Sequence, residues 1–194
     1  MILYTEEVRK MDNITAANDA ISKLSEFRMP RHHELPDIDC YMDQVISIME
    51  KHLYILSSGG SKFITPAMIN NYVKLGLIPP PIKKRYTREH LCHLYIICSL
   101  KSVIAIPAIS ELIGVLTKSR PIFEVYDLFC EAYENMLRRA AETAQEMLSE
   151  TCDPEEGLSK LALFMAVNAA TTQLIATGTL SGIAEDEEPE AEPQ

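Results

Sequence analysis

The segment Phe63–Arg88 constrains the fold more than any other part of the chain. Thr65 and Pro66 are typical of a helix start, because Thr caps free N–H groups and Pro has no N–H to lose in the first turn. Gly76 suits the left-handed residue that follows a helix, and Pro79–Pro81 exclude any continuation of it. The segment therefore predicts a short helix, a proline-rich turn and a basic hairpin.

The predicted helix, Thr65–Leu75, has two different faces when its residues are placed at about 100° intervals. Its apolar face carries Ile69, Tyr72 and Val73. Its opposite face carries Ala67, Asn70, Asn71 and Lys74. Asn pairs with adenine in the major groove and Lys reaches guanine or phosphate, so this second face is suited to reading DNA. A solvated helix face is the alternative interpretation.

Positive charge is concentrated in and after this helix, although the whole chain carries a net charge of −10. The window 57–110 contains seven Lys or Arg and one acid, so it carries +6 and the remainder carries −16. A confined basic region of this kind suits a polyanion such as nucleic acid. A wing that holds the phosphate backbone would use Lys83, Lys84, Arg85, Tyr86 and Arg88. An ordinary basic surface loop is the alternative.

These motifs resemble a known family of regulators. ITPAMINNYVKLGLIPPP followed by KKRYTREHLCHL is similar to the winged helix-turn-helix of MerR-type (mercury-resistance regulator) transcription factors. The matching residues are Tyr72, Gly76, Leu77, Ile78, Tyr86, Thr87 and Leu91. Asn70 and Asn71 stand where many such regulators have Arg-Tyr. RMPRHHELPDIDCYMDQV, MINNYVK and KKRYTREHL together resemble, over about residues 27–116, a bacterial domain-of-unknown-function family distantly related to MerR-type regulators.

The resemblance implies a DNA-binding head followed by dimerising helices. In such a head the hydroxyl of Tyr72 would point toward a phosphate while its ring enters the core. The helices after the head would join two copies in a homodimer. A C-terminal hairpin that folds back onto its own head is the alternative.

Composition and helical patterns give the expected organisation. With 47% hydrophobic residues and few glycines, the chain is expected to be mainly α-helical. We expect an N-terminal helical arm (1–27), a winged helix-turn-helix head with a small β wing (28–118), a C-terminal helical hairpin (119–184) and a disordered acidic tail (185–194).

Local signals place individual helices within this organisation. Asp43–Leu56 has an amphipathic pattern, and Gly59 and Gly60 are expected in the turn that joins it to the helix beginning at Thr65. Thr87 is expected to cap a central buried helix, and Pro107 to begin the next one. In the C-terminal hairpin, the helix that follows the Asp153–Pro154 start signal is expected to end at Gly178 and Gly182.

No catalytic, cofactor or metal motif is found. The sequence lacks a Gly-rich phosphate loop, HExxH, CxxC and GxSxG, so neither an enzyme nor a cofactor is expected. His32 and His33 lie near Cys40, but adjacent histidines point apart and no second ligand pair has zinc-like spacing, so no metal site is expected. His90 and His93 are interpreted as structural.

The remaining features concern location and ligands. Five scattered cysteines are typical of reduced core thiols in a cytoplasmic protein. We expect no signal peptide and no membrane span. An effector pocket between the C-terminal helices is one interpretation of Met136, Met147, Phe164 and Met165, and core packing is the other.

The sequence therefore predicts a sequence-specific transcriptional regulator that binds double-stranded DNA as a dimer. Its predicted contact residues are Thr65, Ala67, Asn70, Asn71, Tyr72, Lys74, Lys83, Lys84, Arg85, Tyr86 and Arg88. The alternative is a non-enzymatic protein-interaction module on a winged-helix scaffold, whose basic face would dock an acidic partner. RNA binding ranks third, because aromatic platforms for stacking bases are missing.

Overall fold

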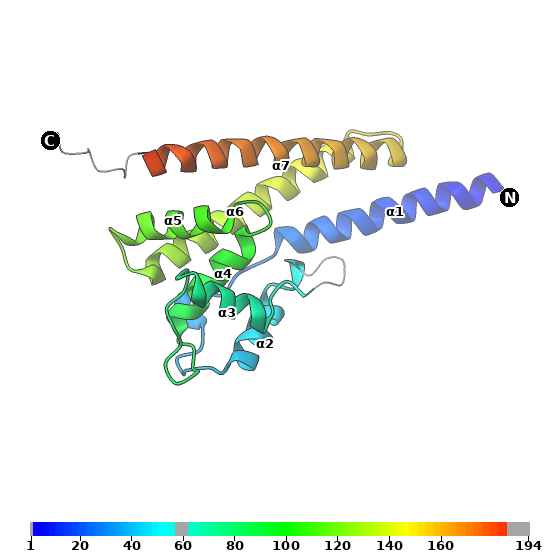
Figure 1. The fold of residues 1–194 in the computed structure, drawn as a ribbon. Coiled ribbons are helices and arrows are strands. Elements are labelled where there is room, and N and C mark those ends of the chain that lie inside the picture. Colours follow the sequence, from blue (N-terminus) through cyan, green and yellow to red (C-terminus); the bar gives the residue numbers. More distant parts are fainter. Residues whose placement is uncertain (1, 57–61, 186–194) are drawn as a thin grey trace. The chain divides into compact units, whose positions relative to one another are not determined.

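A computed structural model describes residues 2–56 and 62–185, which are predominantly helical (Figure 1). The Gly59–Gly60 turn and the tail after Glu185 lie outside the described residues. The α-helices are α1 (Ile2–Ser25), α2 (Met42–His52), α3 (Pro66–Lys74), α4 (Arg88–Leu100), α5 (Ile106–Thr117), α6 (Ile122–Ser149) and α7 (Pro154–Glu185). Two single-turn 3-10 helices accompany them, η1 (His32–Glu34) and η2 (Tyr54–Leu56).

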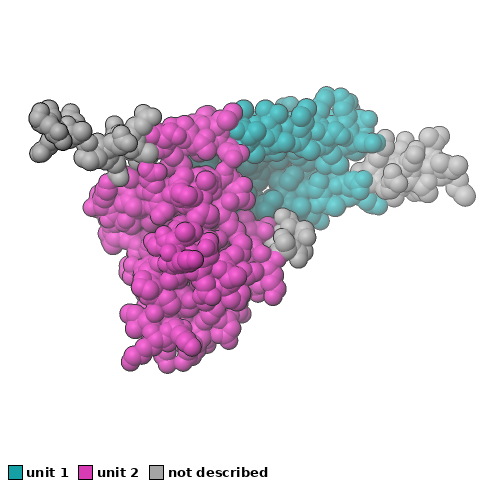
Figure 2. All heavy atoms as spheres, viewed as in Figure 1, with its two compact units in different colours: residues 1–28, 131–172 teal, residues 29–130, 173–194 magenta. Residues whose placement is uncertain are grey.

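The chain divides into two compact units, which are coloured separately in Figure 2. Unit 1 contains residues 1–28 and 131–172, and unit 2 contains residues 29–130 and 173–194. The four-part organisation expected from the sequence stays a prediction.

Helix α4 is the centre of unit 2, as the apolar pattern after Thr87 predicted. Every residue from His90 to Ser99 is buried. A helix that is apolar all round needs neighbours on every side. The buried core of unit 2 includes Val45 and Met49 of α2, Ile69 and Tyr72 of α3, Ile109 and Ile113 of α5, and Val125 and Tyr126 of α6.

Helix α3 begins and ends where the sequence signals predicted. The Met68 N–H donates to the Thr65 hydroxyl at 3.3 Å, and Pro66 occupies the first turn. Gly76 has φ +74°, in the left-handed region, and the Leu77 N–H closes the helix on the Tyr72 carbonyl at 3.0 Å. The helix that carries the predicted contact face is therefore defined at both ends by local interactions.

The predicted β wing, and with it the winged helix-turn-helix architecture, is wrong. The described residues contain no β-strand, and the region has only two isolated antiparallel bridges, Ile82 with Arg85 and Cys40 with Tyr86. Pro79–Pro81 supply no N–H groups, so the chain before Ile82 cannot extend a hydrogen-bonded ladder. The chain is mainly α, as predicted, but the basic segment is a tight turn rather than a sheet.

In unit 1, part of α1, the later part of α6 and the first part of α7 pack through small and aliphatic residues. Ala144, Leu148 and Leu161 are buried together, with Ile21 and Met165 packed against them. The Asp153 carboxylate accepts a hydrogen bond from the Glu155 N–H at 3.0 Å, so it caps α7 as the sequence predicted.

The predicted end of α7 is wrong, because the helix continues through Gly178 and Gly182 to Glu185. Neither glycine has a positive φ angle, so neither acts as a left-handed helix terminator. Only an αL conformation ends a helix in that way, and a glycine within a run of helix-forming residues remains compatible with the helix.

Helix α7 also contains a segment, Pro154–Gly182, that is long and apolar enough to cross a membrane. Its most apolar window has a mean hydropathy of 1.4, and 6% of that window is buried. Core helices of soluble proteins meet the same length and composition criteria, so this feature does not place the chain in a membrane. It does mean that much of the apolar surface of α7 is exposed.

Candidate nucleic-acid interface

Helix α3 separates its two faces in the predicted way. Ile69 and Tyr72 are buried, and Val73 is half-buried. The opposite side is exposed at Ala67, Asn70, Asn71 and Lys74. These four side chains are therefore presented to solvent by a helix whose other side is anchored in the core of unit 2.

The residues Ile82–Arg85, here called the basic turn, form a two-residue hairpin connection. The Arg85 N–H donates to the Ile82 carbonyl at 3.0 Å, and the Ile82 N–H donates to the Arg85 carbonyl at 3.2 Å. Lys83 and Lys84 occupy the central positions with φ +51° and +64°. Two successive left-handed residues define a type I′ turn, which normally takes Asn-Gly. Here both positions carry exposed lysines.

The base of the basic turn is held by the segment Cys40–Tyr41. Cys40 and Tyr86 exchange two backbone hydrogen bonds, each 2.8 Å long. The Arg85 guanidinium lies 5.2 Å from the centroid of the Tyr41 ring, within the range of a cation–π contact. The turn is therefore positioned by residues that precede it by more than forty positions in the sequence.

Four of the predicted contact residues are buried or have structural partners in unit 2. Tyr72 and Tyr86 are each 3% exposed, and burial raises the pKa of Tyr72 to about 12 and raises that of Tyr86. Arg88 is half-buried and forms an ion pair with Asp37 at 3.0 Å. The hydroxyl of Thr65 caps α3 and accepts a hydrogen bond from the Met68 N–H. The exposed predicted residues are the four on α3 together with Lys83, Lys84 and Arg85.

Two open hollows adjoin α3 on the side that faces α5. One, of about 440 Å³, is lined by Ala67, Met68, Asn71, Tyr72, Lys101 and Ile106. The other, of about 530 Å³, is lined by Leu75, Leu77, Ile106, Pro107, Ser110 and Glu111. The Lys101 ammonium donates to the Phe63 carbonyl, so this cation holds the chain before α3. The exposed side of α3 is thus accessible along part of its length.

The buried histidines of α4 have structural roles. The Thr87 N–H donates to His90 Nδ1 at 3.0 Å, so His90 completes the start of α4. His93 Nδ1 lies 2.9 Å from the Glu89 carbonyl one turn earlier. Burial lowers the pKa of His90, with an opposing contribution from the Pro80 carbonyl. The neutral imidazole is therefore the favoured form at the base of the basic segment.

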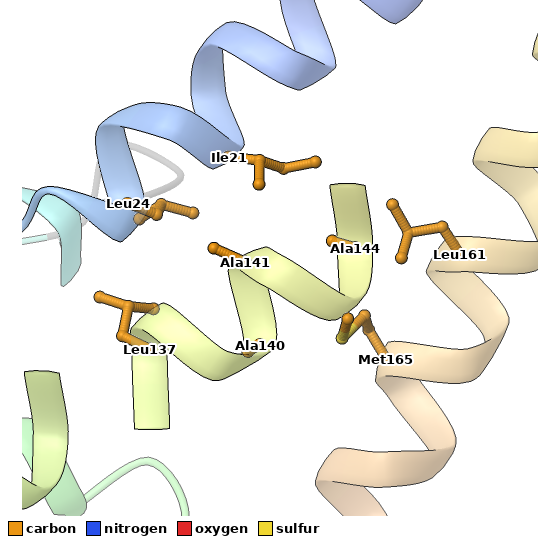
Figure 3. Close-up of a pocket in the computed structure, with 8 residues that line it drawn as sticks. All are labelled: Ile21, Leu24, Leu137, Ala140, Ala141, Ala144, Leu161 and Met165. Atoms are coloured by element: carbon orange, nitrogen blue, oxygen red, sulfur yellow. The ribbon is translucent and has the colours of Figure 1, made fainter. Parts of the chain in front are cut away.

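The four side chains considered for an effector pocket have different environments. Met136 and Phe164 are exposed, whereas Met147 and Met165 pack against the unit 1 core. Figure 3 shows a different cavity, in which Met165 is the one predicted residue. It has a volume of about 180 Å³ and is lined by Ile21, Leu24, Leu137, Ala140, Ala141, Ala144, Leu161 and Met165. Because these side chains are all apolar, the cavity offers no polar group to orient a ligand.

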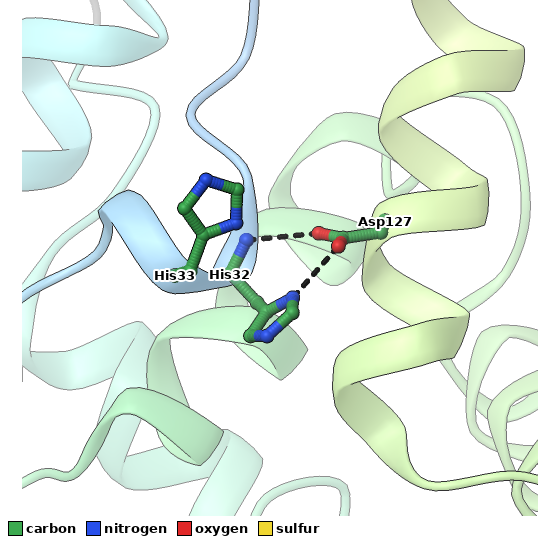
Figure 4. Close-up of side chains that lie close together, drawn as sticks. All are labelled: His32, His33 and Asp127. Carbon is green, nitrogen blue, oxygen red and sulfur yellow. Dashed lines mark hydrogen bonds and ion pairs between the residues drawn. The ribbon is translucent and has the colours of Figure 1, made fainter.

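The structure also assembles a cluster that the sequence analysis missed. Asp127 on α6 accepts one hydrogen bond from the His32 N–H through Oδ1, at 2.8 Å, and its Oδ2 lies 2.7 Å from His32 Nδ1 (Figure 4). One ligand atom each from His32, His33 and Asp127 lie within 4.8 Å of one another. Asp127 is 95 positions from His32, so no spacing motif in the sequence could have joined them.

Comparisons with known proteins give one finding. No curated protein and no solved structure matches the chain. A family described as Domain of unknown function (DUF1836) matches residues 30–134, which include α2 to α5, the basic turn and Asp127. The expectation of a domain-of-unknown-function family is thereby confirmed, whereas no relationship to MerR-type regulators is found. The match spans more than half of the chain, so this protein belongs to the family described as Domain of unknown function (DUF1836).

Proposed function

We propose that this protein is a sequence-specific transcriptional regulator whose unit 2 binds double-stranded DNA. The observation that carries the proposal is the pair of exposed lysines, Lys83 and Lys84, in left-handed backbone conformations at the tip of the basic turn. A left-handed conformation costs a non-glycine residue roughly 1 kcal/mol or more. Strained positions of this kind cluster at functional sites, and two adjacent cations suit a phosphate backbone.

The exposed face of α3 supplies the groups for reading sequence. Asn70 and Asn71 are exposed amides on a rigid helix, and Lys74 adds a cation one turn later. Asn reads adenine through its amide, and contacts of this type distinguish bases by about 1–3 kcal/mol. In the proposal α3 enters the major groove, while the basic turn contacts phosphates and supplies affinity without sequence choice.

The charge distribution supports the same assignment. The window 57–110 carries +6 in a chain of net charge −10, and part of this charge is already neutralised inside the protein. Arg88 is paired with Asp37, and Lys101 is bound to a backbone carbonyl. Of the predicted contact residues, Lys74, Lys83, Lys84 and Arg85 are exposed cations, and Lys62, which precedes α3, is exposed as well.

We further propose that the family is distantly related to MerR-type regulators. The buried Tyr72, the positive φ of Gly76 and the buried Leu77 and Ile78 occupy the positions on which the sequence resembles that family. In the proposal this relationship concerns the helix that reads DNA and its termination, and it includes no β wing.

The test of DNA binding is fluorescence anisotropy with duplex DNA from upstream of the protein's own gene and with a shuffled duplex. Salt is varied from about 50 to about 200 mM, because each phosphate contact contributes about 0.9 to the slope of log K against log salt. We expect tighter binding to the upstream duplex and a steep loss of affinity with salt. Absence of binding to both duplexes at low salt would discard the proposal.

We propose a homodimer that forms through α7. Leu163 and Val167, both in unit 1, are 68% and 53% exposed, and their spacing of four residues places them on one side of the helix. Exposed apolar surface of this extent marks interaction sites in soluble proteins. A second copy of the same helix is the occupant that a dimeric regulator requires, since dimers bind paired half-sites.

The oligomeric state is measured by size-exclusion chromatography with light scattering. We expect a dimer for the parent chain and a monomer for the Leu163→Gln/Val167→Gln variant. Thr172→Gln, an exposed polar position on the other side of the same helix, is the matched control and should remain dimeric. A monomeric parent chain would overturn the dimer, and its adsorption to phospholipid vesicles would assign the apolar surface of α7 to a membrane instead.

A further inference from the structure

The chain around His32 is held on α6 by several independent contacts, all within unit 2. The Tyr126 hydroxyl donates to the Pro30 carbonyl at 2.7 Å, and the His32 N–H donates to Asp127 Oδ1 at 2.8 Å. The ring of Phe123 stacks on the imidazole of His32, with ring centroids 5.5 Å apart and an interplanar angle of 28°. The backbone and the ring of His32 are therefore both oriented before any ligand binds.

His33 completes a group of two imidazoles and one carboxylate. Its ring lies edge-on to that of His32, with centroids 5.5 Å apart. One possible ligand atom from each of His32, His33 and Asp127 lies within 4.8 Å of the other two (Figure 4). His32 and Asp127 are about one-third exposed as side chains, and His33 is exposed, so solvent reaches the group.

We propose that His32, His33 and Asp127 bind a divalent transition-metal ion of the zinc type. Two imidazole nitrogens and a carboxylate oxygen are a ligand set that zinc accepts at about 2.0–2.2 Å, with water in the fourth position. No thiolate belongs to the cluster, so ions that prefer soft sulfur ligands are disfavoured. The ion would replace the direct contact between His32 Nδ1 and Asp127 Oδ2, which now lie 2.7 Å apart.

Reaching this geometry requires little rearrangement. Ligand atoms around a tetrahedral zinc ion lie about 3.3 Å apart, as its bond lengths require. His32 and Asp127 are already within 2.7 Å of each other, and the exposed ring of His33 closes the remaining distance by side-chain rotation. An ion bound here would join η1 to α6, two segments distant in sequence, and would stabilise unit 2 against unfolding.

The test measures zinc binding by isothermal titration calorimetry and by metal analysis after dialysis, on the full chain without an affinity tag. Cys152 is exposed and could bind zinc through its thiol, whereas the other four cysteines are buried, so all variants carry Cys152→Ser. We expect one zinc ion per chain. His33→Ala should weaken binding at least tenfold, on the scale of changes at metal sites.

Because His33 is exposed, His33→Ala should leave the far-ultraviolet circular dichroism and the melting temperature without metal unchanged. Zinc should raise the melting temperature of the parent chain but not that of His33→Ala. Asp127→Asn is the second variant and should also lose zinc. Glu34→Gln, an exposed carboxylate in the same turn, is the matched control and should bind zinc as the parent does.

Less than one zinc ion per chain, or equal affinity in the parent and in His33→Ala, would overturn the proposal. In that case the contact between His32 and Asp127 would be a hydrogen bond that fixes η1 to α6 and nothing more. Loss of zinc by Glu34→Gln as well as by His33→Ala would also overturn the assigned ligand set.

Discussion

The guanidinium of Arg85 lies over the ring of Tyr41, 5.2 Å from its centroid, and one of its N–H groups donates to the Tyr41 hydroxyl at 3.3 Å. This contact fixes one end of the basic turn, directly beside the backbone bridge between Cys40 and Tyr86. The cation is thus oriented by an aromatic ring that is itself 49% exposed. Such an arrangement restricts Arg85 while leaving it accessible to a partner.

Tyr41→Ala should therefore weaken DNA binding by a few-fold without removing any charge. Without the Tyr41 ring, the Arg85 side chain is no longer held in place in the free protein. DNA binding must then immobilise it, at a cost of about 0.5–1.5 kcal/mol. The salt dependence of binding should stay the same, because the number of cations is unchanged. Anisotropy over a salt series measures both quantities, and a reduced salt slope would show that Tyr41 acts in another way.

Replacing Lys83–Lys84 by Asn-Gly should stabilise the protein and weaken its binding to every DNA sequence. Asn and Gly accept the left-handed conformation, so the free energy of unfolding should rise by about 1–2 kcal/mol. Loss of two phosphate contacts should reduce the salt slope by about two. Urea unfolding and anisotropy measure the two effects on the same variant.

Two controls separate strain from charge in that experiment. Lys83→Gln/Lys84→Gln removes the charges but keeps side chains in the left-handed positions, so it should weaken binding without the gain in stability. Lys160→Gln removes an exposed cation that pairs with Glu156 in unit 1, and it should leave DNA binding unchanged. An Asn-Gly variant that binds DNA as tightly as the parent would exclude the basic turn from the interface.

Asn70→Ala and Asn71→Ala should each reduce the preference for the specific duplex over a shuffled one. Loss of an amide that reads a base should cost about 1–3 kcal/mol on the specific sequence and much less on the shuffled one. Both residues are exposed on α3, so the folded structure should be retained. Equal losses of affinity on both duplexes would remove the two amides from sequence recognition.

The same Gly→Ala change should have opposite effects at two positions in unit 2. Gly76 has φ +74° at the end of α3, so Gly76→Ala should destabilise the protein by about 1 kcal/mol. Gly114 lies within α5 with open space around it, so Gly114→Ala should stabilise it by about 0.5–1 kcal/mol. Urea midpoints measure both, and equal signs would contradict the backbone argument.

Acidification should destabilise unit 2 through two histidines, the half-buried His52 and the buried His90. Burial lowers the pKa of His52, whose Nδ1 atom is hydrogen-bonded to the Tyr95 hydroxyl, and burial also lowers the pKa of His90. A lowered folded-state pKa means that the unfolded chain binds the proton first. Stability should therefore be complete above the ordinary histidine pKa of about 6.5 and decline as the pH falls below it.

The measurement is the urea midpoint between about pH 7.5 and about pH 5.5, a range in which most carboxylates stay ionised. His52→Gln and His90→Gln should each flatten the decline, whatever their effect on stability at the higher pH. A midpoint in the parent chain that does not change over this range would contradict the assignment.

Signals within a few residues of one another were sufficient to predict several features correctly. Thr65, Pro66 and Gly76 defined the limits of α3, because caps and left-handed terminators act through bonds to neighbouring backbone groups. The continuous apolar run after Thr87 predicted a helix buried on every side, and α4 has that environment. The faces of α3 followed from helical periodicity alone.

Features that depend on residues distant in sequence were predicted wrongly or were not predicted. The prediction of a β wing was wrong. The prolines before Ile82 supply no N–H groups, and the pairing of Tyr86 with Cys40 is limited to a single bridge, so the region has two isolated bridges and no strand. Arg88 forms an ion pair with Asp37, and the cluster of His32 and His33 is completed by Asp127. Neither partner is close in the sequence. Such pairings arise from how the helices pack, and packing is a collective outcome of the whole core that no local pattern contains.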